Sequence, residues 1–279
     1  MDESTLISVI IPTYERADRL VRAVESVLDQ SDAGCELIVV DDGSTDATAQ
    51  RMASYGTRLR YHRRDHSGVS AARNEGARLA RGEWLAFLDS DDEWLSGKVS
   101  EQRRFHRDNP DVPVSQTGEI WIRNGVRVNP CKHHAKPRGD VFDASLDRCL
   151  VSPSAVMLRR DVFDDIGGFD EDLPVCEDYD LWLRLGSRVH FGLIEEALVV
   201  KYGGHEDQLS RQYWAMDRFR VAAIGKLLEE GCLDRHRRDA ALGVLEGKCR
   251  ILANGARRRG RDGEAGAYER MILRYAANV

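Results

Sequence analysis

Pairs of carboxylates follow two apolar runs of the sequence directly, at the point where each run ends. Asp41 and Asp42 come after one run, and Asp89 and Asp91 come after another. Carboxylates gathered at one place repel one another unless a cation neutralises them. Their hard oxygens suit Mg²⁺ or Mn²⁺, especially when phosphate oxygens complete the coordination shell. Each Asp taken alone could cap a helix or solvate a turn, but the two pairs together predict a divalent cation beside a phosphorylated ligand.

Helical patterns alternate with these apolar runs over the first ninety residues. Such an alternation implies a parallel sheet with helices on both faces. Ligands of these sheets bind beyond the carboxyl ends of the strands, where the acidic pairs stand together with Thr13 and Glu15. The expected strands are 6–11, 37–40, 58–62 and 84–88. Helices are expected around 20–28, at a segment that begins near 46, and over 69–81.

Turn and cap signals predict where several elements begin and end. Ser44 or Thr45 is expected to cap the helix that begins near Asp46, and Gly82 to end the helix over 69–81. Farther along, Asn124-Gly125 between two β-branched runs predicts a hairpin with a type I′ turn. The later strands are expected at 120–123, 126–128, 154–158 and 195–202, and the later helices at 161–166, from Glu177, and at 216–228, 240–252 and 265–275.

Several side chains outside the acidic pairs could also touch a ligand. His133 and His134 lie in a polar loop that could close over a donor, although a plain solvated loop is the stronger interpretation. Trp94 and Trp121 could each stack on a sugar ring. Trp182 lies on the apolar face of a helical pattern, so we expect it in the core.

The charge of the chain is distributed unevenly along its length. The 279 residues include 41 Lys+Arg and 47 Asp+Glu, and 42% of them are hydrophobic. Residues 211–279 carry 15 basic and 9 acidic side chains, which leaves 26 basic and 38 acidic ones in residues 1–210. This shift predicts a boundary near 205–215, after which a basic helical tail follows. The tail could be a solvated surface, an oligomer contact or a contact with anionic lipid.

Composition also argues against several classes of protein. The aromatic residues are not interleaved with the basic ones and the whole chain is acidic, so nucleic-acid binding is not supported. The sequence has no run of about eighteen apolar residues, and its start has acids where a signal peptide needs bases. The six cysteines are scattered without a CxxC pair, which is typical of reduced thiols. We therefore expect a cytoplasmic protein, peripheral at the inner face of the membrane if the tail binds lipid.

Four segments resemble the inverting family 2 glycosyltransferases of the GT-A fold. They are ISVIIPTYERADRLVRAVESVLDQ, ELIVVDDGSTDAT, SGVSAARNEGARLARGEWLAFLDSDDEW and CEDYDLWLRL, in the family's order and spacing between Leu6 and Tyr202. The resemblance implies an α/β fold of the GT-A (Rossmann-like) type, with a mostly parallel central sheet flanked by helices and a helical C-terminal extension. The domains expected from it are a GT-A domain at 1–210, with a nucleotide-binding half at 1–93 and an acceptor-binding half at 94–210, and the extension at 211–279.

The resemblance also implies a role for each residue that matches a family motif. Asp91 is the expected metal ligand, Asp89 contacts the ribose or the donor sugar, and Asp178 is the catalytic base. His205 stands where several relatives contact the metal or the diphosphate, and His66 stands where many relatives have Asn. The other nucleotide contacts are expected from Pro12, Thr13, Tyr14 near the base, Glu15, Asp41, Asp42 on the base imide, and Arg73.

The chemistry of such a site is consistent without the family name. An attacking hydroxyl must lose its proton as it bonds to the anomeric carbon, and a carboxylate such as Asp178 can accept it. A divalent ion stabilises the charge on the departing nucleoside diphosphate. One displacement inverts the anomeric carbon, whereas retention needs a second carboxylate as nucleophile, and no residue is an evident candidate. Asp178 could instead cap its helix, and Asp180 is a competing base that we expect to face solvent.

The sequence therefore predicts a metal-dependent inverting glycosyltransferase. The resemblance implies a UDP-sugar as the donor, because UDP-sugars are common among such relatives, although GDP- and dTDP-sugars would make the same contact with Asp42. Its acceptor is expected to be a hydroxyl of a cell-envelope glycan or of a lipid-linked acceptor. A non-catalytic protein that binds nucleotide sugars or glycans is one alternative. A nucleotidyltransferase is another, but it would need a glycine-rich phosphate loop where this sequence has Pro12-Thr13-Tyr14-Glu15.

Overall fold

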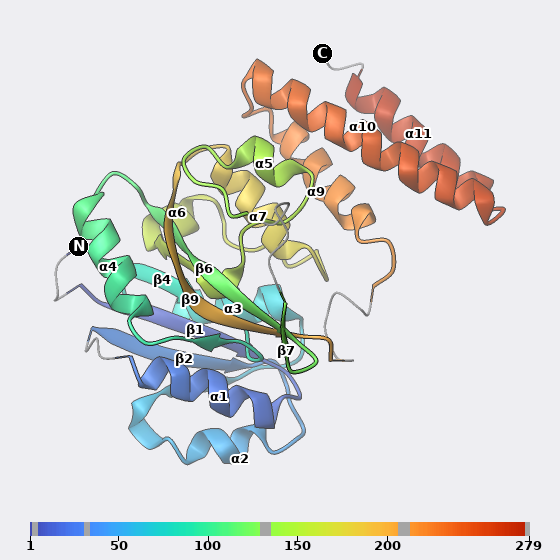
Figure 1. Ribbon diagram of the computed structural model, residues 1–279. Coiled ribbons are helices and arrows are strands. Elements are labelled where there is room, and N and C mark those ends of the chain that lie inside the picture. The colour runs from blue at the N-terminus through green and yellow to red at the C-terminus, as the bar shows by residue number, and fades with distance from the viewer. Residues whose placement is uncertain (2–4, 31–33, 129–134, 206–212, 277–279) are drawn as a thin grey trace.

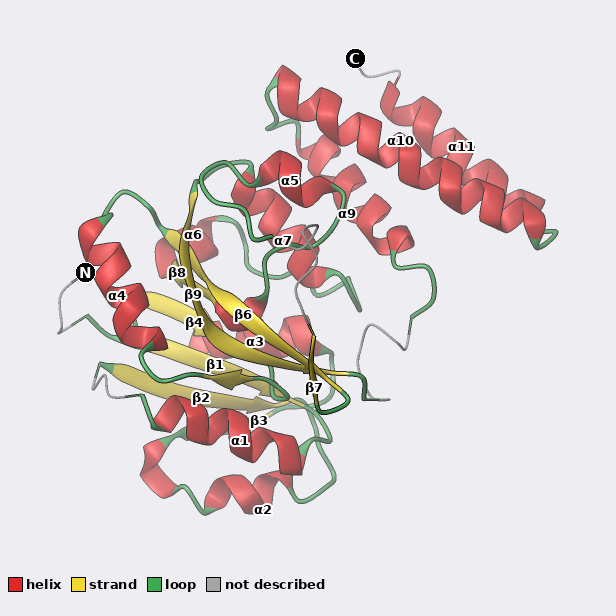
Figure 2. Cartoon of the chain, in the orientation of Figure 1, coloured by secondary structure: helices red, strands yellow, loops and turns green. Residues whose placement is uncertain are grey.

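One nine-stranded sheet runs through the protein in the order β3-β2-β1-β4-β8-β6-β9-β5, with β7 paired to β6 (Figures 1 and 2). The structure is a computed structural model, and it describes the chain except for residues 2–4, 31–33, 129–134, 206–212 and 277–279. The expected loop histidines His133 and His134 thus lie outside the described residues. The strands of the first half are β1 (Ile7–Thr13), β2 (Cys35–Asp41), β3 (Arg60–Arg63) and β4 (Trp84–Phe87).

The first half of the sheet is parallel, as the strand-helix alternation predicts. β1 pairs in parallel with both β2 and β4, and β2 pairs in parallel with β3. Because helices cover both faces, all seven residues of β1 are buried. The carboxyl ends of β1, β2 and β4 therefore meet at one edge, which is where the acidic pairs stand.

The second half of the sheet is mixed, so the expectation of a mostly parallel sheet holds only for the first half. β4 pairs antiparallel with β8, β8 with β6, β9 with β5, and β6 with β7, whereas β6 and β9 are parallel. The strand-helix repeat that enforces parallel crossovers stops after β4. The strands of this half are β5 (Glu93–Trp94), β6 (Val114–Arg123), β7 (Val126–Val128), β8 (Val156–Arg159) and β9 (Phe191–Gly203).

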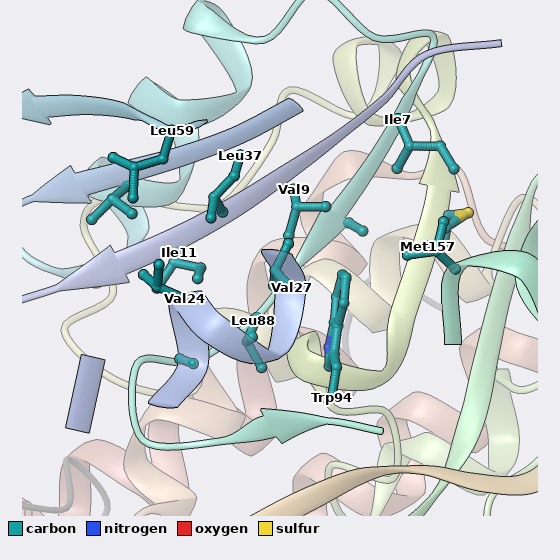
Figure 3. Packing of buried hydrophobic residues seen from close by; sticks show 14 of the residues in the cluster. Ile7, Val9, Ile11, Val24, Val27, Leu37, Leu59, Leu88, Trp94 and Met157 are labelled. Atoms are coloured by element: carbon teal, nitrogen blue, oxygen red, sulfur yellow. The ribbon is translucent and has the colours of Figure 1, made fainter. Parts of the chain in front are cut away.

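Helices cover the two faces of the sheet and form separate cores with it. On one face, Leu20 and Val24 of α1 pack with Val9 and Ile11 of β1, as Figure 3 shows for part of this core. On the other face, Ile10 belongs to a core that includes Trp182, which confirms its expected place. The helices of the sheet domain are α1 (Ala17–Leu28), α2 (Thr48–Ala53), α3 (Val69–Leu79), α4 (Lys98–Asp108), α5 (Phe142–Leu146), α6 (Arg160–Asp165) and α7 (Glu177–Gly186), with 3₁₀ turns η1 (Gly56–Arg58) and η3 (Pro153–Ala155).

Two of the expected helix boundaries are wrong, and one turn is confirmed. Helix α2 begins at Thr48, where Asp46 accepts a hydrogen bond from the Thr48 N–H at 3.0 Å, while Ser44 accepts one from the Glu15 N–H. Helix α3 ends before Gly82, which is glycine for another reason: a Cβ there would lie 2.7 Å from the Leu6 carbonyl oxygen. The hairpin is confirmed, because Asn124 and Gly125 have φ of 50° and 78°, as a type I′ turn requires.

In the described part of the chain, three helices follow the sheet domain, as expected for the C-terminal extension. They are α9 (Asp217–Glu230), α10 (Arg235–Arg258) and α11 (Asp262–Ala276), and Figure 1 shows α10 and α11 side by side. Val221 and Ile224 of α9 share a buried core with Tyr179 and Leu183 of α7. The extension is therefore packed onto the sheet domain through α7, the helix that carries the expected catalytic base in its first turn. Among the described residues, no helix is both long and apolar enough to cross a membrane.

Candidate active site

The loops that follow β1, β2 and β4 meet at one edge of the sheet. The Asp42 N–H donates to the Thr13 carbonyl at 2.9 Å, which joins the loops after β1 and β2. Arg16 Nη1 lies 3.0 Å from Asp91 Oδ2, which joins the loops after β1 and β4. The expected nucleotide and metal residues are thus brought together, as the sheet topology predicts.

Asp42 is held by the loop that precedes α3. Its carboxylate accepts hydrogen bonds from the backbone N–H groups of Gly68 at 2.7 Å and Ser67 at 3.1 Å. His66 Nδ1 lies 2.9 Å from Asp42 Oδ2. The φ of 96° at Gly68 is a conformation that favours glycine. Asp42 is therefore buried and fixed at the lip of the site, and this role for His66 was not predicted.

Tyr14 and His66 form an aromatic pair beside Asp42. Their ring centroids lie 4.1 Å apart with an interplanar angle of 26°, and Tyr14 is 44% exposed. The backbone of Glu15 has a φ of 53°, and its carboxylate accepts hydrogen bonds from the N–H and hydroxyl of Thr45. The loop after β1 is thus tied to the loop after β2, and it presents an accessible aromatic ring suited to a nucleobase.

Three buried residues support this edge of the sheet: Asp41, Pro12 and Thr13. The Asp41 carboxylate is fully buried, and it accepts hydrogen bonds from the Ser44 N–H and from the Tyr61 hydroxyl. Pro12 is buried in register with Val40. The Thr13 hydroxyl is buried and has no hydrogen-bond partner within the described part of the chain. Asp41 therefore shapes the turn that carries Asp42, and the Thr13 hydroxyl retains a free bonding capacity.

Arg73 joins the end of β4 to the start of α7. It donates one hydrogen bond to Asp89 and another to Glu177, each at 2.7 Å, and its guanidinium is buried. Burial raises the pKa of Asp89, but Arg73 and Lys201 outweigh it and hold that pKa below its usual range. Burial and the Asp178 carboxylate raise the pKa of Glu177 to about 7. Glu177 therefore anchors α7 to the acidic edge through Arg73.

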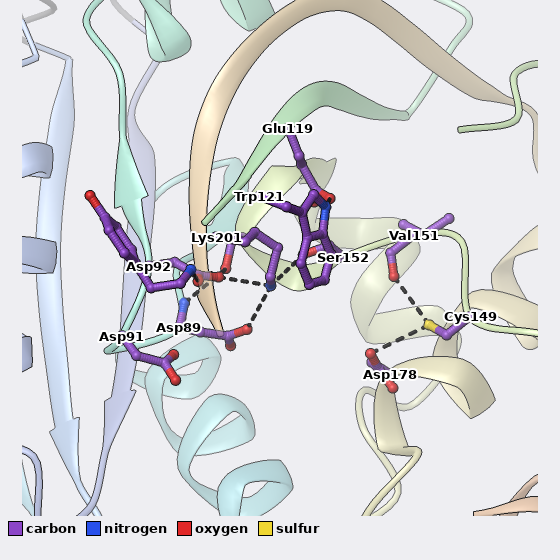
Figure 4. A network of polar contacts seen from close by, with 12 residues as sticks. Asp89, Asp91, Asp92, Glu119, Trp121, Cys149, Val151, Ser152, Asp178 and Lys201 are labelled. Atoms are coloured by element: carbon purple, nitrogen blue, oxygen red, sulfur yellow. Dashed lines mark hydrogen bonds and ion pairs between the residues drawn. The ribbon is translucent and has the colours of Figure 1, made fainter. Parts of the chain in front are cut away.

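Lys201 of β9 is a second cation among the acidic residues, and the sequence analysis did not predict it (Figure 4). Its ammonium lies 2.7 Å from Asp92, 3.4 Å from Asp89 and 2.9 Å from the Ser152 hydroxyl. Burial raises the pKa of Asp92 to about 7 even with Lys201 beside it. The signal available in the sequence was a single Lys inside the apolar run of β9.

Asp91 and His205 lie together at the lip of the site. His205 Nε2 and Arg16 Nη1 each lie 3.0 Å from Asp91 Oδ2, and Arg22 donates to the Asp91 carbonyl at 2.7 Å. Neighbouring ligands of an octahedral ion with bonds of about 2.1 Å lie about 3 Å apart. The spacing of Asp91 and His205 therefore fits two ligands of one Mg²⁺ or Mn²⁺. No group of three or more His, Cys, Asp or Glu that could hold an ion is found in the described ranges.

Asp178 stands in the first turn of α7 with two other carboxylates. Glu177 is buried against Arg73, and Asp180 is buried against Arg184, whose Nη2 lies 2.6 Å away. The expectation that Asp180 faces solvent is thus wrong. Asp178 is half-buried, and it accepts hydrogen bonds from the Tyr179 N–H at 2.7 Å and the Cys149 thiol at 3.4 Å.

The Cys149 thiol is a hydrogen-bond donor because burial, and then Asp178 itself, raises its pKa well above the usual range. Because Glu177 and Asp180 are both buried against arginines, Asp178 is the one carboxylate of this helical turn that is partly open to a ligand. Figure 4 shows it on the opposite side of the view from Asp89 and Asp91. Of the other sequence candidates, Trp94 is buried and donates to the Ser154 carbonyl, so it belongs to the core, whereas Trp121 is exposed.

The sequence and the fold are both similar to those of known glycosyltransferases. An uncharacterized glycosyltransferase of Rickettsia typhi is 31% identical over 210 residues, which are 74% of this chain and 66% of that protein. The chain spans about a third of the length of three other Rickettsia relatives. The UDP-Glc:alpha-D-GlcNAc-diphosphoundecaprenol beta-1,3-glucosyltransferase WfaP of Escherichia coli is 31% identical over 66% of this chain and 71% of its own.

Among solved structures, Staphylococcus aureus TarS 1–349 in complex with UDP-GlcNAc superposes with a TM-score of 0.79. It is 20% identical, and the match covers 98% of this chain and 84% of TarS 1–349, so the chain has the GT-A fold. The model of the family described as Glycosyl transferase family 2 matches residues 8–167, which include the acidic pairs and Arg73. The chain therefore belongs to glycosyl transferase family 2.

Proposed function

We propose that this protein transfers a sugar from a nucleoside diphosphate sugar, with UDP as the nucleotide, to a hydroxyl of a glycan or of a lipid-linked acceptor. The observation that carries the proposal is the position of Asp178. This partly open carboxylate follows Glu177, which Arg73 ties to Asp89 at the acidic edge. The base and the donor site are thus held in one rigid arrangement, as a single displacement requires.

The nucleotide would bind along the loops after β1 and β2. The Tyr14 ring offers a stacking surface for the base, and the Asp42 carboxylate beside it can accept from a base imide. The Thr13 hydroxyl is a free partner at the same edge. Asp89, which Arg73 and Lys201 keep ionised, would accept from ribose or donor-sugar hydroxyls. The TarS neighbour holds UDP-GlcNAc, which supports UDP as the nucleotide.

A divalent ion would be held by Asp91 and His205, whose 3.0 Å separation fits adjacent ligands. When bound, Mn²⁺ or Mg²⁺ supplies electrostatic stabilisation of the departing diphosphate. Arg16 also lies 3.0 Å from Asp91. When a ligand is present, its guanidinium can form charge-assisted hydrogen bonds with the phosphate oxygens instead.

Asp178 would accept the proton of the attacking hydroxyl. The Tyr179 N–H and the Cys149 thiol each bind one of its oxygens, which fixes the plane of the carboxylate. Because the neighbouring Glu177 and Asp180 are neutralised by arginines, the described residues offer no second free carboxylate in this turn. One displacement with inversion of the anomeric carbon is therefore the mechanism that the arrangement favours.

The C-terminal extension would bring the site to an anionic membrane surface, where a lipid-linked acceptor is held. Trp214 is 49% exposed, and the guanidinium of Arg218 lies 4.0 Å from its ring centroid. Arg259 and Arg261, at the turn between α10 and α11, lie 5.5 and 5.7 Å from the same ring. An accessible indole among arginines suits the boundary of an anionic bilayer. The WfaP relative is named for a lipid diphosphate acceptor, which supports this class of acceptor.

The decisive experiment replaces Asp178 by Asn and measures donor binding and turnover separately. UDP-sugar binding with Mn²⁺ is followed by calorimetry, and UDP release is followed with and without acceptor. We expect Asp178→Asn to bind the donor as wild type does but to lose transfer by about 10²- to 10⁴-fold. Asp165→Asn, an exposed position on α6, is the matched control. Full transfer by Asp178→Asn would exclude this base, and donor binding without any turnover by the wild type would favour a non-catalytic binding protein.

A further inference from the structure

Trp121 is a large apolar side chain left accessible beside the acidic edge. It is 44% exposed near the end of β6, although aromatic residues of a central strand are usually covered. In the parallel pairing of β6 with β9, Trp121 stands in register with Lys201. The Lys201 ammonium lies 5.8 Å from the indole centroid and also binds Asp89 and Asp92. The Lys201 side chain therefore links Trp121 to Asp89, one of the residues expected to hold the donor.

The orientation of this indole is fixed by a buried ion pair. The Trp121 Nε1–H donates to Glu119 Oε2 at 3.2 Å. The other oxygen of Glu119 lies 3.0 Å from Lys136 Nζ, and both of these charged groups are almost fully buried. Lys136 in turn lies 3.3 Å from Gln116 of the same strand. An exposed ring with its polar edge anchored in this way is pre-organised, so a ligand that stacks on it pays little ordering entropy.

We propose that Trp121 is the stacking platform for the acceptor sugar, an inference that rests on the proposed function. The C–H face of a pyranose ring is apolar and its rim carries hydroxyls. The indole can cover the apolar face, while polar groups nearby bind the rim. In the view of Figure 4 the indole is drawn between Asp89 on one side and Asp178 on the other. A sugar held there would have a hydroxyl facing the base and the donor behind it.

The structure favours the acceptor over the donor as the occupant of this platform. The donor side of the cluster is Asp89 with Arg73, and Lys201 separates this side from the ring. Trp121 comes from β6, the strand that follows α4, within the part of the chain expected to bind the acceptor. The other candidate for stacking, Trp94, is buried and therefore cannot reach a sugar.

The test uses the full chain with three soluble acceptor probes: an alkyl diphosphate of GlcNAc, p-nitrophenyl β-GlcNAc and p-nitrophenyl β-glucoside. Transfer from UDP-glucose and UDP-GlcNAc identifies the best probe for the wild type. With that probe, we expect Trp121→Ala to raise the acceptor KM by about 10- to 100-fold and Trp121→Phe by less. The donor dissociation constant is expected to stay within about twofold, since the ring lies outside the donor contacts.

Fluorescence gives a second readout that does not depend on turnover. In the presence of UDP, the chosen probe is expected to change the tryptophan emission of the wild type and not that of Trp121→Phe. Val126→Ala, at a 67% exposed position of the same hairpin, is the control for a general effect on β6 and β7. A folded Trp121→Phe and Trp121→Ala pair whose acceptor KM matches the wild type would overturn the platform while leaving the transferase intact. A wild type that transfers to no probe and does not turn over its donor would instead count against the proposed function.

Discussion

Arg73 Nη1 lies 2.7 Å from Glu177 Oε1, which joins two residues that are 104 positions apart in the chain. The other arm of the same guanidinium binds Asp89 at 2.7 Å. The residue before the proposed base is thereby tied to the strand end that we propose as part of the donor site. A buried guanidinium between two carboxylates is satisfied only when both partners are present. This bridge explains how the acidic edge and α7 keep a fixed relation without a direct backbone link.

Replacing Arg73 should therefore be costly for stability as well as for activity. Arg73→Met leaves Glu177 buried without a cation and Asp89 with Lys201 alone. We expect the free energy of unfolding to fall by about 3–5 kcal/mol, as measured by urea denaturation. The control is Arg51→Met, because Arg51 pairs with Asp18 at the surface and such pairs contribute less than about 1 kcal/mol. Equal losses of unfolding free energy for the two variants would show that the buried Arg73 bridge contributes no more to stability than a surface ion pair.

Glu177 predicts a pH dependence of stability whose sign follows from its pKa. Burial and Asp178 raise this pKa from its ordinary value of 4.5 to about 7. The native state thus holds the proton more tightly than the unfolded chain. The stabilisation is complete below pH 4.5 and is lost as the pH rises through 7. Glu177→Gln keeps an oxygen for Arg73 and cannot ionise, so its stability relative to wild type should increase between pH 5 and pH 8.

The measurement is urea denaturation of both proteins at half-unit intervals over that pH range. Glu196→Gln, at an exposed position of β9, removes the same charge without the buried environment. The difference between Glu177→Gln and wild type should change steadily with pH, while the difference for Glu196→Gln should stay flat. A parallel course for the two variants would contradict a raised pKa at Glu177.

The parts of this site that follow from local patterns could be predicted, and the parts that depend on distant packing could not. The carboxyl ends of β1, β2 and β4 meet because parallel strands share an edge, so Asp42 and Asp89 were predicted together. Lys201 binds Asp89 across 112 positions of the chain, and the sequence pattern gives no such pairing. It stood out only as a charge in an apolar strand, which signals a buried partner without identifying it.

Asp180 is a second residue whose role depends on tertiary packing, although its ion-pair partner is close in the sequence. The spacing of Asp180 and Arg184 at i and i+4 allows a helical ion pair, and this much was visible in the sequence. The burial of that pair depends on the carbonyls of Ile166 and Gly168, which accept from Arg184 at 2.7 and 2.8 Å. Those carbonyls come from the turn after α6, whose docking on α7 is a tertiary contact. A base and a structural carboxylate two residues apart could therefore not be told apart from their spacing alone.

Asp91 and His205 predict a cation site that needs the nucleotide for its completion. Mn²⁺ alone should bind weakly, because the described residues offer two ligands, and UDP should strengthen the binding through its phosphates. Electron paramagnetic resonance of free Mn²⁺ measures both affinities. Asp91→Asn and His205→Ala should each weaken the binding of Mn²⁺ in the presence of UDP by about tenfold or more.

Chelation with EDTA should abolish transfer by the wild type, and added Mn²⁺ should restore it. Asp165→Asn again controls for the loss of a carboxylate away from the site. If His205→Ala binds Mn²⁺ with UDP as tightly as wild type, the imidazole contacts the diphosphate or Asp91 rather than the ion. If Asp91→Asn does so as well, the ion is held elsewhere.

The arginines around Trp214 predict an electrostatic contact with anionic lipid. Arg218 and Arg259 have no carboxylate partner within the described part of the chain, and Arg261 has only a 3.6 Å contact with Glu264. Charges left uncompensated beside an exposed indole retain their full attraction for phosphate headgroups. Each arginine near an anionic surface contributes about 1 kcal/mol, so replacing all three by Gln should weaken vesicle binding by about 100-fold.

Cosedimentation with vesicles of phosphatidylcholine, with and without phosphatidylglycerol, measures this difference. The matched control replaces Arg235, Arg250 and Arg274 by Gln, which removes the same charge from exposed positions elsewhere in the extension. The first triple variant should lose binding to the anionic vesicles, and the control should lose little. Because the attraction is electrostatic, raising the salt concentration should reduce wild-type binding toward that of the first variant. Equal losses for the two triple variants would mean that net charge, and not the arrangement around Trp214, determines the contact.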